Sequence, residues 1–149
     1  MTWIPALNTF VFIALATVHA YWALGGTVGL AASLPADSSG VIQLRPTASM
    51  TWAVAVGLLL LAGFSAAHLA FGPGQAPTWL RVADGAMAAV FGLRAVGDFQ
   101  YLGLSKRIRG TTFARRDSRY YTPLCLLLAA SSGGGWQWHP DTFSDRPAS

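Results

Sequence analysis

Residues 48–71 read ASMTWAVAVGLLLLAGFSAAHLAF and lie inside an interval, Pro46 to Leu80, that holds no aspartate, glutamate, lysine or arginine. A helix needs about 20 mostly apolar residues to cross the hydrocarbon core of a bilayer, and its backbone groups then bond to one another. Pro46 before the stretch and Gly72-Pro73-Gly74 after it are residues that interrupt helices. We therefore predict a membrane-spanning helix over residues 48–71.

Two further segments, residues 4–24 and 80–102, have a similar length and character. No formally charged side chain occurs before Asp37. The first segment lacks the basic residues that open a secretory signal and is longer than the apolar part of one, so we expect a retained anchor. The last segment is apolar apart from a few charged and polar residues. The sequence thus predicts three spanning helices.

The composition of the whole chain agrees with this interpretation. Its 149 residues are 53% apolar and 11% charged, whereas soluble domains have about 25% charged residues. A soluble protein with an unusually apolar core is the main alternative, and two separate charge-free runs in so short a chain argue against it. We expect an all-α membrane protein, with its helices in an antiparallel bundle that crosses the plasma membrane several times.

A fourth apolar segment, residues 121–132, has only about half the length of a crossing before the glycines at 133–135 interrupt it. This segment is either re-entrant or interfacial, or the chain is shortened here. We expect residues 1–132 to form a single transmembrane helical domain and residues 133–149 to be a polar, flexible tail.

The basic residues predict the orientation of the helices. Six of the ten lie in one connection, between Ser105 and Tyr120. Basic connections face the cytoplasm, so the connection at residues 25–47 is also cytoplasmic and the one at residues 72–78 is external. A basic surface of this kind attracts anionic lipid headgroups, and we expect no role in binding nucleic acid. The expected headgroup contacts are Lys106, Arg107, Arg109, Arg115, Arg116 and Arg119.

Ionisable and polar residues inside the spans are costly and are the first candidates for a functional site. If neighbouring helices run antiparallel, their depths divide them into two groups. The group nearer the cytoplasm comprises His19, Arg94, Asp98 and Tyr101, and the secondary group comprises Asn8, His68 and Asp84. Such groups either hold helices together, at about 1 kcal/mol or less per hydrogen bond, or bind a substrate or proton. Arg94 and Asp98, four residues apart, can also neutralise each other.

Metal and cofactor chemistry has little support. The single cysteine, Cys125, excludes an internal disulfide and any zinc site made of cysteines. His19 and His68 lie about 20 Å apart along the membrane normal, too far to hold one haem between them. We expect no metal and no cofactor. No nucleophile–base combination is recognisable, so enzymatic activity is left open and not favoured.

Several motifs resemble a known family. They are His19-Ala-Tyr-Trp-Ala-Leu-Gly-Gly26, Leu93-Arg-Ala-Val-Gly-Asp-Phe-Gln-Tyr101, Lys106-Arg107, Phe113-Ala-Arg115, Asp117 and Tyr120-Tyr-Thr-Pro-Leu-Cys125. Together they resemble the bacterial membrane protein family named domain of unknown function 3995, over most of the chain as far as Cys125. The resemblance implies four membrane helices and no established activity. The chain departs from it after Ala130, as a truncation or an altered reading frame would produce.

Three functions fit these features. A non-enzymatic structural or accessory membrane component is favoured. The alternatives are a small-solute or proton-coupled transporter that uses His19, Arg94 and Asp98, and a membrane enzyme that acts on a lipid or isoprenoid substrate. The expected partners are the bilayer and its anionic headgroups, and a homo-oligomer or a second membrane protein is left open.

Overall fold

The computed structural model describes residues 3–35, 41–42, 45–71, 75–97, 103–107 and 110–133, and this part of the chain is all-helical, as predicted. The long helices are α1 (Trp3–Ala23), α3 (Ala48–Ala67), α4 (Thr78–Val96) and α6 (Thr122–Gly133). The short ones are α2 (Leu30–Ser33), the 3₁₀ turn η1 (His68–Ala70), α5 (Thr112–Arg116) and the π-helical turn η2 (Asp117–Tyr121).

The first two long helices begin and end close to the predicted residues. Helix α1 covers residues 3–23 against the predicted 4–24, and α3 with η1 covers residues 48–70 against the predicted 48–71. Helix α3 begins where the Thr47 hydroxyl accepts a hydrogen bond from the Met50 amide at 3.3 Å. This cap satisfies one of the free amides of the first turn.

The predicted extension of the third helix to residue 102 is wrong, because α4 ends at Val96. Gly97 follows it with a φ of 90°, a backbone conformation that glycine adopts without a steric penalty and that stops the helix. The chain then returns to the end of α4, where the Leu104 amide donates to the Ala95 carbonyl at 2.9 Å.

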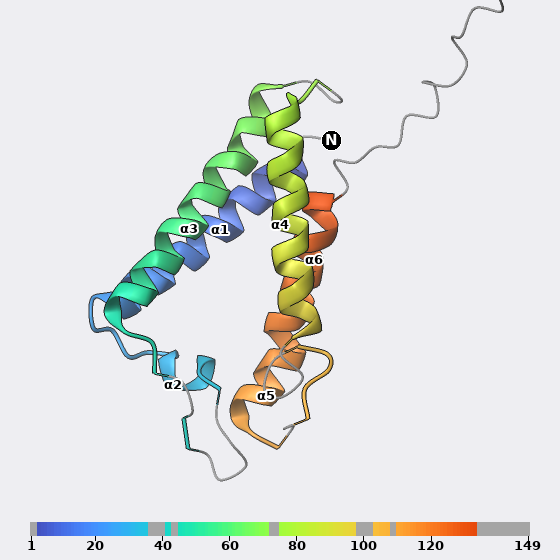
Figure 1. Ribbon diagram of the computed structural model, residues 1–149. Coiled ribbons are helices and arrows are strands. Elements are labelled where there is room, and N and C mark those ends of the chain that lie inside the picture. The colour runs from blue at the N-terminus through green and yellow to red at the C-terminus, as the bar shows by residue number, and fades with distance from the viewer. Residues whose placement is uncertain are drawn as a thin grey trace, which may run out of the picture.

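The long helices form two antiparallel pairs, α1 with α3 and α4 with α6, which Figure 1 shows leaning away from each other toward the end that carries α2 and α5. A small core joins the pairs. Its centre is Phe12 of α1, which is fully buried and stacks on Phe91 of α4 with 5.5 Å between the ring centroids. Met87 and Leu128 contribute from α4 and α6.

Helix α6 runs beside only part of α4. Its last residue, Gly133, lies beside Ala88, because a Cβ placed on Gly133 would be 3.6 Å from the Ala88 Cβ. Ala88 is near the middle of α4. The described end of the fourth apolar segment therefore reaches about half-way along its partner, and the expected polar tail lies outside the described residues.

The two connections that the sequence assigns to the cytoplasmic side lie together at one end of the molecule. Helix α2 contacts α5 there, and the Ser33 and Tyr121 hydroxyls are 3.0 Å apart (Figure 1). The end of α3 and the beginning of α4 lie at the opposite end (Figure 1).

Two of the described helices, Trp3–Ala23 and Ala48–Ala70, are long and apolar enough to cross a membrane. Only 17% and 22% of their most apolar windows are buried, whereas the core helix of a soluble protein is mostly buried. Helix α4 is not among them, since it carries Arg81, Asp84 and Arg94. Three spans are therefore not established by length and composition, although two helices have the required character.

Candidate functional site

A fully buried carboxylate, Asp117, lies where α4 and α6 meet at the α5 end of the molecule. Its Oδ1 accepts a hydrogen bond from Arg94 Nη2 at 2.9 Å, and its Oδ2 accepts one from Lys106 Nζ at 2.7 Å. The Gly103 amide and the Thr122 hydroxyl also donate to Oδ2, at 2.9 and 3.1 Å. We call these five residues the Asp117 cluster.

A π-helical turn orients Asp117. In η2 the Thr122 amide donates to the Asp117 carbonyl, five residues back. In a regular α-helix, side chains five residues apart would point about 140° away from each other. The wider turn brings the Asp117 carboxylate and the Thr122 hydroxyl together, and π turns of this kind occur frequently at functional sites.

Gly103 occupies a position that only glycine fits. Its φ is 76°, and an added Cβ would lie 2.5 Å from the carbonyl oxygens of both Ala95 and Val96. Because the chain passes this close to the end of α4, the Gly103 amide reaches the Asp117 carboxylate. The cluster thus ties the segment that follows α4 to the end of that helix.

The charge state of Asp117 follows from its neighbours. Burial by itself would raise the pKa of the carboxyl, because it disfavours the charged form. The hydrogen bonds from Lys106 and Arg94 outweigh burial, with further help from the Arg94 charge and the Gly103 amide, and hold the pKa of Asp117 below its ordinary value. Asp117 is therefore ionised at neutral pH.

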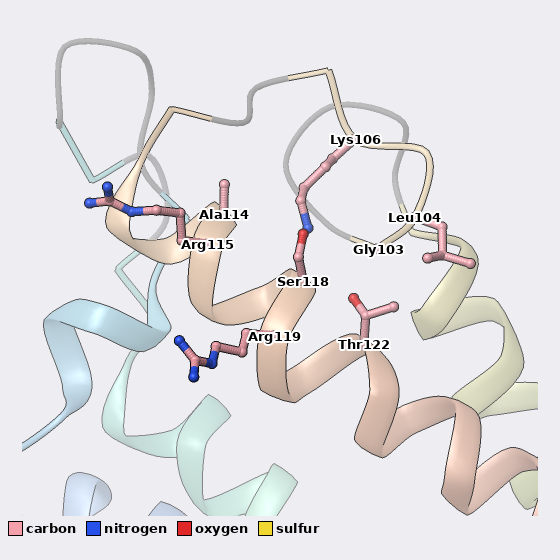
Figure 2. A pocket seen from close by; sticks show the side chains of 8 residues that line it. All are labelled: Gly103, Leu104, Lys106, Ala114, Arg115, Ser118, Arg119 and Thr122. Atoms are coloured by element: carbon pink, nitrogen blue, oxygen red, sulfur yellow. The ribbon is translucent and has the colours of Figure 1, made fainter.

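An open pocket of about 550 Å³ lies beside the cluster. Figure 2 shows Lys106 reaching across it toward the helical turn that carries Ser118, with Arg115 and Arg119 along the same turn. The residues that line it are Gly103, Leu104, Lys106, Ala114, Arg115, Ser118, Arg119 and Thr122. The pocket therefore combines basic, hydroxyl and apolar side chains.

The residues expected near the cytoplasm are only partly described. Arg94 belongs to the Asp117 cluster, while Asp98 and Tyr101 lie outside the described residues. His19 Nδ1 is 2.8 Å from the Leu15 carbonyl oxygen, and its ring lies edge-on to Trp22 at 5.1 Å. Among the described residues, these contacts of His19 stay on its own helix and do not reach Arg94.

The three residues of the secondary group take part in two separate contacts. His68 Nε2 lies 2.9 and 3.0 Å from the two carboxylate oxygens of Asp84, which joins η1 to α4. Asn8 is instead the partner of Ser131, whose hydroxyl donates to the Asn8 Oδ1 at 3.0 Å. These two contacts join the α1–α3 pair to the α4–α6 pair, at sites away from the Asp117 cluster.

The residues expected to contact lipid headgroups differ in their exposure. Arg107, Arg115, Arg116 and Arg119 are exposed, whereas Arg109 lies outside the described residues. Lys106 has only 3% of its side chain exposed and contacts Asp117. Lys106 therefore belongs to the buried cluster and not to the exposed basic surface, because Asp117 holds its ammonium group inside.

Sequence reasoning did not select Asp117, Gly103, Thr122 or Ser131 as site residues. Asp117 had a recognisable signal, since it is the single acidic residue among six basic ones between Ser105 and Tyr120. Gly103 and Ser131 depend on close approaches between segments that are distant in the sequence, and Thr122 depends on the π turn that brings it to Asp117. Spacing alone does not reveal these features. No group of three or more His, Cys, Asp or Glu side chains within the described residues is arranged to hold a metal ion.

The fold and the cluster define a small all-helical protein with two helices apolar enough to cross a membrane and a buried ionic centre at one end. The chain belongs to the family described as protein of unknown function (DUF3995), whose model matches residues 12–132. This match confirms the resemblance found in the sequence, and it includes the whole Asp117 cluster. No curated protein and no solved structure matches the chain.

Proposed function

We propose that the chain is a multi-pass protein of the bacterial plasma membrane and serves as a non-enzymatic structural or accessory component. In this proposal α1, α3 and α4 cross the bilayer and α6 inserts part of the way. The Asp117 cluster lies at the cytoplasmic side and holds α4 to the basic segment that follows it.

The observation that carries the proposal is the exposure of large apolar side chains on the long helices. Phe10 of α1 is 69% exposed, Leu60 of α3 is 60% exposed and Val82 of α4 is 65% exposed. Soluble monomers rarely leave large continuous apolar surfaces in water. Lipid is the solvent that suits such surfaces. The low burial of α1 and α3 argues against their being core helices of a soluble protein.

Helix α4 fits the role of a third span although it carries three charges. Its 19 residues extend about 28 Å, close to the thickness of the hydrocarbon core. Asp84 is within hydrogen-bond distance of His68, and Arg94 is paired with Asp117, so each of these two groups has a polar partner. Arg81 is exposed in the first turn, where a long side chain can reach the headgroups.

The pairing of the buried ionisable groups supports a structural role. Asp117 is shared between Arg94 and Lys106, and Asp84 contacts His68. Each contact joins two different segments. Polar contacts that hold membrane helices together also join separate segments. A transporter relay through His19, Arg94 and Asp98 would need His19 to reach Arg94, and the contacts described for His19 do not support it.

The test expresses the full chain and washes the membrane fraction with carbonate at high pH, which releases peripheral proteins. The expected result is retention in the pellet. Arg94→Ala, which leaves Asp117 with one cation fewer, should then lower the yield of folded protein in detergent, while Arg116→Gln on the exposed surface should not. Release by carbonate would contradict membrane insertion, and an unaffected Arg94→Ala yield would contradict the structural role.

A further inference from the structure

The pocket beside the Asp117 cluster has two arginines whose charge no described residue compensates. Arg115 and Arg119 both line it, and neither has an ion-pair partner among the described residues. Arg119 stands with its guanidinium carbon 5.6 Å from the centroid of the Tyr120 ring. Like charges four residues apart on a helical segment repel each other, so an anion between them would relieve an unfavourable contact.

Asp117, the carboxylate that the structure describes beside this pocket, cannot serve as that anion. Both oxygens of Asp117 are already bonded, Oδ1 to Arg94 and Oδ2 to Lys106 together with two further donors. Arg115 and Arg119 thus give the pocket two positive charges that Asp117 does not compensate. The walls of the pocket are therefore positive even though an acidic residue lies directly behind them.

The donors that remain match a phosphate group. The guanidinium groups of Arg115 and Arg119 each present paired N–H donors, the geometry that binds phosphate oxygens in pairs. Ser118 lies between them in the sequence, lines the same pocket and is exposed. Its hydroxyl, which Figure 2 shows directed toward Lys106, offers another donor.

One wall of the pocket favours a lipid over a free anion. Leu104 lines it and is 63% exposed, and its amide bonds to the Ala95 carbonyl at the end of α4. Leu93 and Val96, also near the end of α4, expose 72% and 48% of their surface. Leu104 thus adds apolar surface to a pocket that basic residues also line, as a ligand with a phosphate and an acyl chain requires.

We propose that this pocket binds the phosphate group of one anionic phospholipid headgroup per chain, through Arg115, Arg119 and Ser118. This inference rests on the proposed membrane insertion and deepens it, because it assigns headgroup binding to one pocket and not to the basic segment as a whole. Arg107 and Arg116 are exposed on the same segment but do not line the pocket.

The test purifies the full chain in detergent and measures bound lipid by native mass spectrometry after addition of phosphatidylglycerol or phosphatidylcholine. The parent should retain one phosphatidylglycerol in preference to phosphatidylcholine. Arg115→Gln with Arg119→Gln should lower the affinity at least about tenfold, because two cations near a headgroup are removed. Arg107→Gln with Arg116→Gln removes the same charge from the same segment and should retain the lipid.

Ser118→Asp is a second variant, which places a negative charge on an exposed position of the pocket wall and should also abolish retention. Equal loss in both double variants, or no preference for phosphatidylglycerol in the parent, would overturn the inference. Complete displacement of the lipid by millimolar inorganic phosphate would overturn the lipid assignment in favour of a free anion. Membrane insertion is tested separately, since each variant is first checked for retention in carbonate-washed membranes and for its melting temperature.

Discussion

Arg94 and Asp117 are 23 residues apart in the sequence, and a 2.9 Å hydrogen bond from Nη2 to Oδ1 joins them. One residue is near the end of α4 and the other begins η2, so this contact fixes where the chain returns after α4. With Lys106 on the second oxygen, the carboxylate organises three segments at one end of the molecule. Variants of these residues should therefore change the stability of the folded chain and its dependence on pH.

Replacing Asp117 with asparagine should strongly destabilise the folded chain. The change keeps the size of the side chain but removes the negative charge that Arg94 and Lys106 contact inside the protein. Removing one partner of a buried ion pair costs about 3–5 kcal/mol. Thermal unfolding in detergent measures the effect, with Arg116→Gln as the surface control. A melting temperature equal to that of the parent would show that the cluster is not a stabilising element.

The same cluster predicts a dependence of stability on pH. The pKa of Asp117 is lowered in the folded state, so the stability it contributes is present above the unfolded value of about 3.9 and is lost as the pH falls through the folded value. Asparagine has no such titration. The stability difference between the parent and Asp117→Asn should stay constant from about pH 7 to pH 5 and shrink below about pH 4. A difference that grows on acidification would contradict the assigned charge state.

Gly103→Ala should destabilise the turn after α4. Backbone strain at a φ of 76° costs about 1–3 kcal/mol, and the new Cβ would also press on the Ala95 and Val96 carbonyls. Gly110→Ala is the matched control, because nothing lies within 4 Å of a Cβ placed there. Melting temperatures of the two variants give the comparison. Equal effects would mean that the close approach at Gly103 is absent in solution.

The contact between His68 and Asp84 should be a modest one. A double-mutant cycle with His68→Ala and Asp84→Ala isolates the interaction between the two side chains. Polar contacts between membrane helices measured in this way contribute about 0.6 kcal/mol on average, with a maximum near 1.7 kcal/mol. We expect a coupling free energy in this range from unfolding in detergent. Strictly additive losses would show that the two residues do not interact.

The sequence was sufficient for the apolar helices because their signal is local. The interval from Pro46 to Leu80 contains no formal charge, and α3 with η1 ends within one residue of the predicted end. The end of α4 was missed because Phe99, Tyr101 and Leu102 continue the partly apolar character past Gly97, where the positive φ stops the helix. Hydropathy does not distinguish a glycine inside a helix from one that ends it.

The site was harder to predict because its partners are distant in the sequence. The i, i+4 spacing made Asp98 the expected partner of Arg94, while the described partner is Asp117. Likewise, depth grouped Asn8 with His68 and Asp84, and the structure pairs Asn8 with Ser131 on α6. Depth along a helix can be estimated from residue number, but which helices face each other depends on tertiary packing.

The most direct test of the proposed membrane topology is the labelling of single cysteines with a membrane-impermeant maleimide. Two variants are made in a Cys125→Ser background. In one a cysteine replaces Gln75 between α3 and α4, and in the other a cysteine replaces Gly110 shortly before α5. We predict that Gln75→Cys is labelled in spheroplasts and that Gly110→Cys is labelled only after permeabilisation. Labelling of both positions to the same extent in spheroplasts would contradict a bilayer crossed by α1, α3 and α4 with the Asp117 cluster inside.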